Sequence, residues 1–539
     1  MGGSARVRTR DMTVTESRTM SAGALAVRSL EAHGVELVFG IPGTHNLAIY
    51  RALGESGIRH VTPRHEQGAG YAADGYARAS GRPGVAIVTT GPAVLNAATA
   101  AAQAWSDSVP LLLLAPGMPL RHPAASTGYL HEMLDQRLAM SGVVERAVRV
   151  QSHVELAREL ADAFAAFAGR RPRARFVEIP LDLLAAKAAC GPLRAPAVRP
   201  GEADPDALDR AAELLAGARR PLVVAGGGAH GAGAELSGLL ARGVPVLTTI
   251  NGKGCVDEHH PLALGARLGL GASQAQIVAA DVLLVVGSEL GESDLWRTGL
   301  APAGAVIRID LDPAQAHGNV DAAVALIGDA AVTLSALLRR MPAAEPTVDG
   351  EWHARRGDID REAAAAGRPW AGLSAALEAA LEPGDVLVAD NAMVAYNGVL
   401  GAVRLGAGSR FLFPTGFGTL GYALPAAIGA KLARPGRRVV AVLGDGGIMF
   451  TIQELATAAE RRLSLPVVVS LNGGYGEIRR EMIEQDFPPL GVDLAPVDLP
   501  AIAEAMGGHG LALPDAGGLP AALEAAFERP GPTLITVPE

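Results

Sequence analysis

The chain has 539 residues, 49% of them hydrophobic, and a formal net charge of -9. Because domains cluster at roughly 100 to 200 residues, this length favours about three domains. The negative charge and the lack of a Lys/Arg block argue against a nucleic-acid partner, whose binding rests on clustered positive charge. Every apolar run is far shorter than the ~20 residues that cross a bilayer, so we expect no membrane partner either.

The opening segment and the cysteines bear on location. Residues 1–19 contain four arginines but lack the apolar core of a secretory signal, so we expect a disordered leader or an over-extended start there. Cys190 and Cys255 lie in different regions without the spacing of metal ligands. This argues against a disulfide framework and fits a reducing cytoplasm.

Short β-rich runs then alternate with alanine-rich helical stretches, which is typical of doubly wound α/β domains with parallel sheets. We predict a first domain over 20–190, a proline-rich linker at 191–205, a central domain over 203–342 and a third domain over 366–539. The first and third domains have similar sizes and strand rhythm, as a pair of related domains would. The predicted strands are 37–40, 60–63, 85–89, 111–114 and 176–179, then 222–225, 244–247, 282–286 and 306–309, and finally 386–389, 439–443, 467–471 and 533–537.

Three titratable residues of the first domain are candidates for chemistry. Glu66 follows a predicted strand, and by itself it is best interpreted as a helix-start acid stabilised by the helix dipole. His45 and His131 suit proton donation or the binding of a carboxylate, and a structural role is an equal alternative for each.

The most informative stretch begins where a predicted strand runs into Gly444, Asp445, Gly446 and Gly447. These glycines let the backbone approach an anion at the start of a helix, predicted to begin near Thr451, where free N–H groups favour phosphate. Asp445 can offer a carboxylate oxygen to Mg²⁺, which often bridges a protein carboxylate and phosphates.

A second strand ends in Asn472, at the carboxyl edge of the sheet, where ligands bind in open α/β sheets. Asn472 lies 27 residues after Asp445, enough for one helix and one return strand, so both side chains can face the same crevice. The backbone carbonyl of Gly474 would supply a third oxygen to the metal.

The Asp445 turn, the segment QELATA at 453–458 and the Asn472 turn together resemble the diphosphate and magnesium signature of thiamine-diphosphate enzymes. This resemblance covers nearly the whole chain and implies a pyrimidine-binding, a central and a diphosphate-binding domain, with thiamine diphosphate and Mg²⁺ as cofactors. The residues it implies in this part of the cofactor site are Gly444, Asp445, Gly446, Gly447, Asn472, Gly474 and Tyr475. Leu471 departs from the pattern, because the family usually has asparagine there.

The segment around Glu66 resembles the activating-glutamate segment of the acetolactate-synthase-like group of these enzymes. In that group, a carboxyl group at the pyrimidine ring nitrogen promotes the reactive tautomer of the cofactor. Segment 415–430 resembles the part that grips the aminopyrimidine, which implies that the Gly418 carbonyl accepts from the amino group and that Leu420 bends the cofactor. Because the family's glutamate and diphosphate site come from different subunits, a dimer or tetramer is implied.

Four segments look closer to 5-guanidino-2-oxopentanoate decarboxylases than to acetolactate synthases: 39–45, 130–136, 287–294 and 475–482. A guanidinium substrate needs a carboxylate partner, preferably a bidentate one. The candidate acids are Glu132, Asp135, Glu292, Asp294 and Glu477, although a solvated surface acid is the alternative for each. The candidate catalytic residues are thus Glu66, His45, His131 and Glu477. Three positions depart from the acetolactate-synthase pattern: His131 replaces a glutamine, Ala93 a glycine and Leu95 a small polar residue.

The expected function is Mg²⁺-dependent decarboxylation of a 2-oxo acid, with 5-guanidino-2-oxopentanoate as the candidate substrate. One alternative is an acetolactate-synthase-like carboligase that joins a 2-oxo-acid-derived enamine to a second carbonyl compound. Another is a non-catalytic protein of the same fold. Acetolactate synthases carry FAD in the central domain, but many relatives do not. The glycine run AGGGAHGAG at 225–233 is a weak dinucleotide signal, so FAD is not expected.

Overall fold

The computed structural model describes residues 13–14 and 17–539, except 124–125, 196–197, 199–200, 298 and 343–349. The chain forms two compact units. The first joins Met1–Arg199 with Ile428–Ala433, and the second joins Pro200–Ala427 with Arg434–Glu539. No helix among the described residues combines the length and the apolar character needed to cross a membrane.

The end of the predicted leader is part of the fold. Residues 1–12 and 15–16 lie outside the described residues, but strand β1 (Thr13–Val14) pairs antiparallel with β10 (Leu193–Arg194). Strand β2 (Arg18–Ser21) likewise pairs with β9 (Lys187–Cys190). The prediction that disorder extends to residue 19 is therefore wrong for these strands. Backbone pairing needs no apolar run, so hydrophobic patterning carries no signal for such strands.

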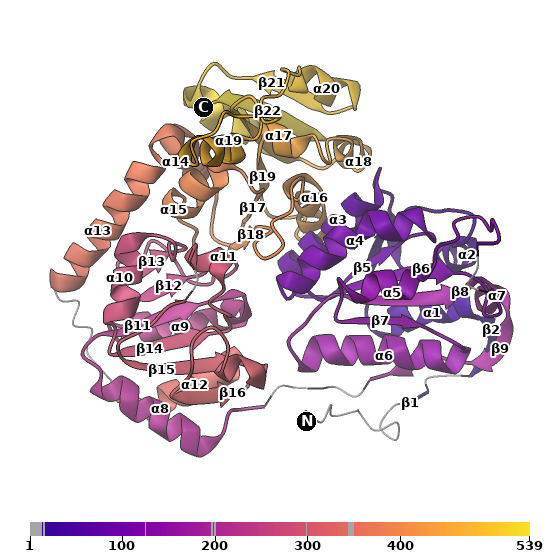
Figure 1. Cartoon of the computed structure of the whole chain (residues 1–539), viewed down its shortest axis with the longest axis horizontal. Coiled ribbons are helices and arrows are strands. Elements are labelled where there is room, and N and C mark those ends of the chain that lie inside the picture. The colour runs from indigo at the N-terminus through magenta and orange to yellow at the C-terminus, as the bar shows by residue number, and fades with distance from the viewer. Residues whose placement is uncertain are drawn as a thin grey trace. The chain divides into compact units, whose positions relative to one another are not determined.

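The first unit is built on a six-stranded parallel sheet in the order β4-β3-β5-β6-β8-β7. Its strands are β3 (Leu37–Gly40), β4 (Arg59–Val61), β5 (Gly84–Ile87), β6 (Leu111–Gly117), β7 (Arg146–Arg149) and β8 (Arg175–Pro180). Figure 1 shows α3 (Glu66–Ser80) and α4 (Pro92–Ser106) on one face, with α1 (Ala22–Ala32) and α6 (His153–Gly169) on the other. The shorter helices are α2 (Leu47–Gly54), α5 (Gln136–Ser141) and α7 (Leu181–Ala185). Because both faces are covered, the inner strands are continuous apolar runs.

The second unit contains a central sheet in the order β13-β12-β11-β14-β15-β16. Its parallel strands are β11 (Pro221–Ala225), β12 (Val246–Thr248), β13 (Ala263–Gly265), β14 (Val282–Val286), β15 (Ala305–Asp310) and β16 (Val324–Ile327). The associated helices are α8 (Pro205–Gly217), η2 (Gly227–Ala232), α9 (Gly233–Leu240), α10 (Gly271–Ala279), α11 (Glu292–Leu295), η3 (Pro313–Ala316) and α12 (Ala330–Arg340). Numbered along the chain, this order is 3-2-1-4-5-6, which is the strand order of dinucleotide-binding sheets.

The second unit also contains a C-terminal parallel sheet in the order β18-β17-β19-β20-β22-β21. Its strands are β17 (Val386–Ala389), β18 (Arg410–Leu412), β19 (Val439–Gly444), β20 (Leu465–Leu471), β21 (His509–Ala512) and β22 (Pro532–Pro538). Numbered along the chain, this sheet and that of the first unit both have the order 2-1-3-4-6-5. A shared order is what related domains should have. The predicted fold class, three doubly wound parallel-sheet domains, is confirmed.

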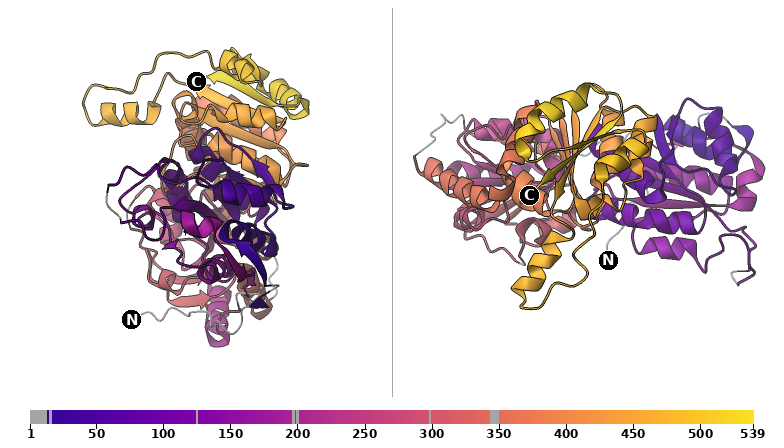
Figure 2. Two further views of the ribbon diagram at one scale, coloured as in Figure 1. Left: turned by 90° about the vertical axis from the view of Figure 1, so that its right-hand side faces the viewer. Right: turned by 90° about the horizontal axis from the view of Figure 1, so that it is seen from above.

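The helices of the C-terminal part include one that stands apart. They are α13 (Gly350–Ala366), η4 (Arg368–Trp370), α14 (Ala371–Ala380), the π-helix η5 (Val394–Val399), α15 (Leu400–Ala402), α16 (Ala423–Ala433), α17 (Asp445–Ile448), α18 (Glu454–Glu460), α19 (Gly476–Glu484), α20 (Leu499–Ala505), η6 (Ala516–Gly518) and α21 (Leu519–Glu528). Both views of Figure 2 show α19 and the segment after it projecting away from the sheet. None of the residues of α19 is buried, although the helix has an apolar side.

The strands that sequence reasoning missed share one position. In the three six-stranded sheets, the unpredicted strands are β7, β13, β16, β18 and β21, and each is the outermost strand of its sheet. An edge strand is shorter and packs against fewer neighbours, so it needs no continuous apolar run. Hydrophobic patterning therefore found the inner strands and overlooked five of the six edges.

Candidate active site

The predicted metal residue Asp445 lies directly after β19. Its Oδ1 accepts from the backbone N–H of Gly446 at 2.9 Å, and its Oδ2 accepts from that of Gly473 at 2.7 Å. Weaker contacts come from the N–H groups of Asn472 and Gly474, at 3.2 and 3.3 Å. The turn and the end of the next strand therefore hold one carboxylate between them. The helix predicted to begin near Thr451 instead begins as a single turn at Asp445, and a second helix, α18, follows.

The Asn472 amide and the Gly474 carbonyl oxygen lie close to this carboxylate. One terminal atom of the Asn472 amide, either its oxygen or its nitrogen, lies 3.2 Å from Asp445 Oδ1 and 3.0 Å from the Gly474 carbonyl oxygen. If the amide nitrogen occupies that place, it donates to both; if the oxygen does, three oxygens face one another and need a cation between them. Oxygens bound to Mg²⁺ at 2.0 to 2.1 Å in octahedral geometry lie about 3 Å apart. The three residues thus fit a magnesium ion.

The Asn472 turn is fixed by its surroundings. Gly474 has φ +143, and a Cβ there would lie 2.1 Å from the Val492 carbonyl oxygen, so only glycine fits. The backbone N–H of Tyr475 donates to that same oxygen at 2.9 Å. Arg479 of α19 donates to the carbonyl groups of Asn472 and Gly473 at 3.2 and 3.3 Å. These contacts hold the turn in the shape that aims the Gly474 carbonyl at Asp445.

Asp390, a residue that sequence reasoning missed, connects this turn to residues 415–421. This loop is the start of the segment predicted to grip the aminopyrimidine, and we call it the pyrimidine loop. Asp390 is fully buried after β17, and its Oδ2 accepts from the backbone N–H of Gly421 at 2.7 Å. The same oxygen lies 3.5 Å from where a Cβ of Gly447 would be. Burial raises the pKa of Asp390 to about 7, although several backbone N–H groups oppose this shift. A polar residue directly after a buried strand was the signal available for it, as it was for Asp445.

The pyrimidine loop contains two of the predicted cofactor-binding residues and is held by side-chain hydrogen bonds. Gly418 is exposed with φ +66, and Leu420 is half-buried. Asn391 holds the loop, because its Nδ2 donates to the Thr419 carbonyl at 2.9 Å. The hydroxyl of Thr451 also donates to the Gly421 carbonyl at 2.7 Å. The loop with Gly418 and Leu420 and the turn with Asp445 therefore form one connected group in the second unit.

In the first unit, Glu66 is the first residue of α3 and is half-buried. Its Oε2 accepts from Asn96 Nδ2 of α4 at 3.0 Å. Its charge also affects Tyr50, whose pKa is raised by burial first and by Glu66 second. Glu66 thus lies where strands of a parallel sheet end, which is the edge at which ligands bind.

His45 and His131 lie close together in this unit. Their ring centroids are 5.3 Å apart, and the Nδ1 atoms of both approach the hydroxyl of Thr90, at 2.6 and 3.2 Å. Thr90 is fully buried. Burial lowers the pKa of His45, and the charge of His131 adds to this effect. Sequence reasoning did not single out Thr90, because an isolated threonine carries no motif.

The five candidate acids differ in their hydrogen-bond partners and in their exposure to solvent. Glu132 accepts from the backbone N–H groups of the 127–129 loop and lies 3.1 Å from His122 Nε2. Asp135 caps α5 by accepting from Leu138 N at 2.7 Å, and Asp294 accepts from Ile250 N at 3.0 Å. Glu292 is exposed. Glu132, Asp135 and Asp294 therefore accept from backbone N–H groups, and Glu292 is solvated.

Glu477 differs from the other acids. It lies in the first turn of α19 and is half-buried, and one of its oxygens pairs with Arg480. The other oxygen, Oε2, is buried and has no hydrogen-bond partner among the residues that the structure describes. Burial raises the pKa of Glu477; Arg480 opposes this, and Glu481 and Glu484 add to it. Glu477 therefore has the capacity to accept a donor from a bound cation.

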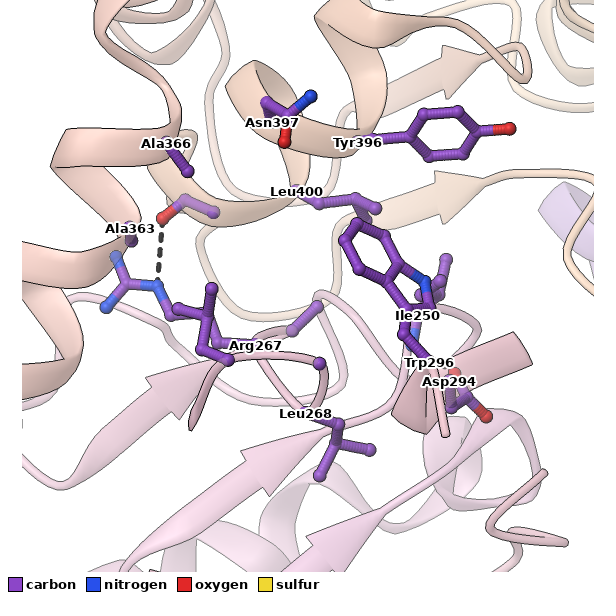
Figure 3. Close-up of a pocket in the computed structure, with 14 residues that line it drawn as sticks. Ile250, Arg267, Leu268, Asp294, Trp296, Ala363, Ala366, Tyr396, Asn397 and Leu400 are labelled. Carbon is purple, nitrogen blue, oxygen red and sulfur yellow. Dashed lines mark hydrogen bonds between the residues drawn. The ribbon is translucent and has the colours of Figure 1, made fainter. Parts of the chain in front are cut away.

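A solvent-open pocket with about 580 Å³ of free space lies in the second unit (Figure 3). Trp296 and Tyr396 form its aromatic corner, with ring centroids 6.0 Å apart and nearly perpendicular planes. Arg267 also lines it, with its Nε donating to the Gly401 carbonyl at 2.8 Å. The hydroxyl of Tyr396 donates to Asn391 Oδ1 at 2.8 Å. Because Asn391 also bonds to the pyrimidine loop, hydrogen bonds connect Tyr396 in the pocket lining to that loop.

Comparison with known proteins identifies the family. The N-terminal TPP binding domain of thiamine pyrophosphate enzymes matches residues 20–139, the central domain matches 208–337 and the C-terminal TPP binding domain matches 397–537. The chain belongs to the thiamine pyrophosphate enzyme family. Thiamine pyrophosphate is another name for thiamine diphosphate, so the prediction of a thiamine-diphosphate-dependent enzyme is confirmed.

Relatives of this thiamine pyrophosphate enzyme match over most of their length. It is 43% identical to a probable 2-ketoarginine decarboxylase of Pseudomonas aeruginosa, over 98% of this chain and 95% of the relative. It is 34% identical to an acetolactate synthase of Arthrospira platensis, over 85% and 83% of the two chains. It is 30% identical to the large subunit of acetolactate synthase isozyme 1 of Escherichia coli, over 97% and 95%. The predicted resemblance to the acetolactate-synthase-like group is confirmed.

Proposed function

We propose that this thiamine pyrophosphate enzyme is a Mg²⁺-dependent decarboxylase of 5-guanidino-2-oxopentanoate, also called 2-ketoarginine. The observation that carries the substrate proposal is the buried Oε2 of Glu477, which has no hydrogen-bond partner within the described parts of the chain and therefore suits a guanidinium group. The 43% identity to a probable 2-ketoarginine decarboxylase supports the same substrate. The alternative is acetolactate-synthase-like carboligation, which the identities of 30% and 34% to acetolactate synthases support.

Each part of the cofactor has proposed ligands in the chain. Asp445, Asn472 and the Gly474 carbonyl would hold Mg²⁺, and the turn at 444–447 with Tyr475 would hold the diphosphate. Gly418 and Leu420 would contact the aminopyrimidine, and Glu66 would share a proton with its ring nitrogen. When bound, thiamine diphosphate supplies the electron sink for the electron pair released with carbon dioxide.

Decarboxylation also requires one proton from the protein or solvent. A 2-oxo acid anion plus a proton gives an aldehyde and carbon dioxide, so one proton is consumed in each turnover. We propose His45 and His131 as the groups that supply it, because an imidazole exchanges protons near neutral pH. The pair lies at the carboxyl edge of its sheet, as Glu66 does.

The substrate proposal predicts a preference that depends on Glu477. Wild-type enzyme should have a kcat/KM for 5-guanidino-2-oxopentanoate roughly ten- to a hundred-fold higher than for pyruvate or the neutral 2-oxoheptanoate, because a charge-assisted contact contributes about 1.5 to 3 kcal/mol. Glu477→Gln should erase this preference while thiamine-diphosphate affinity stays unchanged. Glu484→Gln is the matched control, since Glu484 is an exposed acid of the same helix. Carbon dioxide release from the panel of 2-oxo acids measures each value.

The substrate proposal also predicts the direction in which the KM for the guanidino substrate changes with pH. Because burial raises the pKa of Glu477, the ionised form that binds a cation gains population as pH rises through that pKa. The KM for the guanidino substrate should therefore fall with rising pH and then level off, while the KM for pyruvate should not follow. If pyruvate is turned over best and acetolactate accumulates, the carboligase alternative replaces the decarboxylase.

We propose that the central domain holds no FAD, which the visible absorption spectrum of the purified protein tests directly. We also propose a cytoplasmic location, supported by two buried free thiols, Cys190 and Cys255, that fit a reducing compartment. Recovery of the protein in a periplasmic or extracellular fraction would contradict this location.

We further propose that the active site forms between two copies of the chain, in a dimer or tetramer. Exposed apolar side chains flank the proposed site residues in both units. Phe450 of the second unit is 45% exposed, and Leu134 of the first unit is 86% exposed. On the projecting segment, Ile483 and Leu490 are 60% and 82% exposed. Large exposed apolar side chains beside site residues favour a protein interface, and a second copy presents the complementary unit.

A mixing experiment tests the shared site. Glu66→Gln and Asp445→Ala should each be inactive, but co-refolded or co-expressed chains should regain up to about a quarter of wild-type activity, because half of random dimers are hybrids with one intact site of two. Mixing two preparations of the same variant is the control. Should the mixture stay as inactive as its components while size analysis shows hybrids, each site belongs to one chain.

A further inference from the structure

Three polar side chains of the first unit form one hydrogen-bonded chain. Thr90 Oγ1 lies 2.6 Å from His45 Nδ1 and 3.2 Å from His131 Nδ1. The hydroxyl is fully buried and has one proton to donate. The same atom of both imidazoles therefore depends on a single hydroxyl, which limits the protonation states that the pair can adopt.

The backbone is built to hold this arrangement. His131 has φ +61, a left-handed conformation that is unusual for a residue other than glycine. It packs on Gly91, where a Cβ would lie 2.7 Å from the His131 carbonyl oxygen. The buried amide of Gln136 accepts from Gly91 N and donates to the Pro116 carbonyl, both at 2.8 Å. A strained residue kept in place by buried polar contacts is typical of a functional site.

The two contacts of Thr90 favour one pair of tautomers when both imidazoles are neutral. If both imidazoles donated to the hydroxyl oxygen, the buried hydroxyl proton would have no acceptor among the described contacts, whereas donating to one imidazole and accepting from the other uses that proton as well. Hydrogen bonds donated by a hydroxyl are typically shorter than those donated by an N–H group. The shorter contact, to His45, is therefore the one that Thr90 donates, and His131 donates to Thr90 through Nδ1–H. His45 then has its proton on Nε2, and His131 Nε2 is unprotonated.

We propose that Thr90 is a positioning residue that keeps His45 in its neutral Nε2–H form and directs the next proton to Nε2 of His131. Protonating His131 at Nε2 leaves both hydrogen bonds intact. Protonating His45 at Nδ1 breaks its bond from Thr90 and leaves the buried hydroxyl proton without an acceptor. This inference rests on the proposed decarboxylation, in which the pair supplies one proton per turnover.

Other titratable groups surround the pair. The Tyr129 ring faces His45, with centroids 6.2 Å apart, and the His122 ring faces Tyr129 at 5.8 Å. Glu132 lies 3.1 Å from His122 Nε2. Of these residues, none makes a hydrogen bond to Thr90 among the described contacts. The hydroxyl therefore sets the tautomers, while these groups contribute only through their charges.

Nitrogen NMR of protein containing ¹⁵N-histidine tests the inference without cofactor or substrate. The chain has 13 histidines, so His45→Gln and His131→Gln assign the two residues by loss of signals. Wild-type protein above neutral pH should show His131 as the Nδ1–H tautomer and His45 as the Nε2–H tautomer. Thr90→Val should return His131 to the Nε2–H form, because the partner at Nδ1 decides the tautomer. Thr90→Ser keeps the hydroxyl and should preserve the wild-type pattern.

Kinetics then separate a positioning role from a structural one. Thr90→Val should lower kcat roughly ten-fold or more and shift the acid side of its pH profile, with KM changed less than about two-fold. Thr90→Ser should stay within about three-fold of wild type. Wild-type His131 in the Nε2–H form, or unchanged tautomers in Thr90→Val, would overturn the inference. Because the NMR result needs no turnover, it stands even if no 2-oxo acid is decarboxylated.

Discussion

Asp445→Ala is expected to weaken Mg²⁺-dependent binding of thiamine diphosphate by more than about 100-fold, since even residues that only support a metal ligand are worth roughly ten- to a hundred-fold in affinity. The carboxylate is the one charged group among the three proposed ligands, so its loss leaves a neutral amide and a carbonyl oxygen for a divalent cation. Titration calorimetry with and without Mg²⁺ measures the affinity. The rise in melting temperature on adding cofactor and metal gives a second readout.

Two controls make this result specific to the metal site. Asp445→Asn keeps the side-chain shape and one acceptor oxygen for the backbone N–H groups, so it should lose metal affinity with less disturbance of the turn. Asp498→Ala removes another aspartate of the same domain, the cap of α20 that accepts from Ala501 N, and should leave cofactor affinity unchanged. Wild-type affinity in a folded Asp445→Ala protein would remove Asp445 from the metal site.

Glu66→Gln is expected to keep the cofactor bound and to lose activity by roughly 10²- to 10⁴-fold, the usual contribution of a group that transfers a proton. A neutral amide has nearly the same shape as the carboxyl group but cannot share a proton with the pyrimidine ring nitrogen. Steady-state carbon dioxide release gives kcat, and the calorimetric titration of thiamine diphosphate confirms that the variant still binds it.

Neighbouring residues provide the comparison for Glu66. Glu55→Gln changes an exposed acid of the same unit and should leave both measurements at wild-type values. Asn96→Ala removes the amide that donates to Glu66 Oε2 at 3.0 Å, so it should lower kcat by a smaller factor than Glu66→Gln. Turnover near that of wild type in Glu66→Gln would exclude Glu66 from proton transfer.

The inner strands and the polar residues that follow them could be predicted from the amino-acid sequence. Strands such as β14 and β17 have the predicted bounds, because a strand buried on both faces must be a continuous apolar run. Asp445 and Asn472 could be paired from sequence, since parallel strands end at one edge and polar residues after them face one crevice. Edge strands such as β7 and β21 were not predicted, because a strand at the edge of a sheet is not buried among neighbouring strands and helices on all sides.

The hydrogen-bond partners of the polar groups became visible only in the folded chain. Glu132, Asp135 and Glu477 look alike in sequence, but the first two bond to backbone N–H groups, whereas a buried oxygen of Glu477 has no partner among the described side chains and backbone groups. Asp390 and Thr90 emerged in the same way, because their contacts join segments 31 and 41 residues apart. Hydrogen bonds are short and directional, so they depend on the placement of side chains from distant segments, and no local pattern of residues encodes that placement.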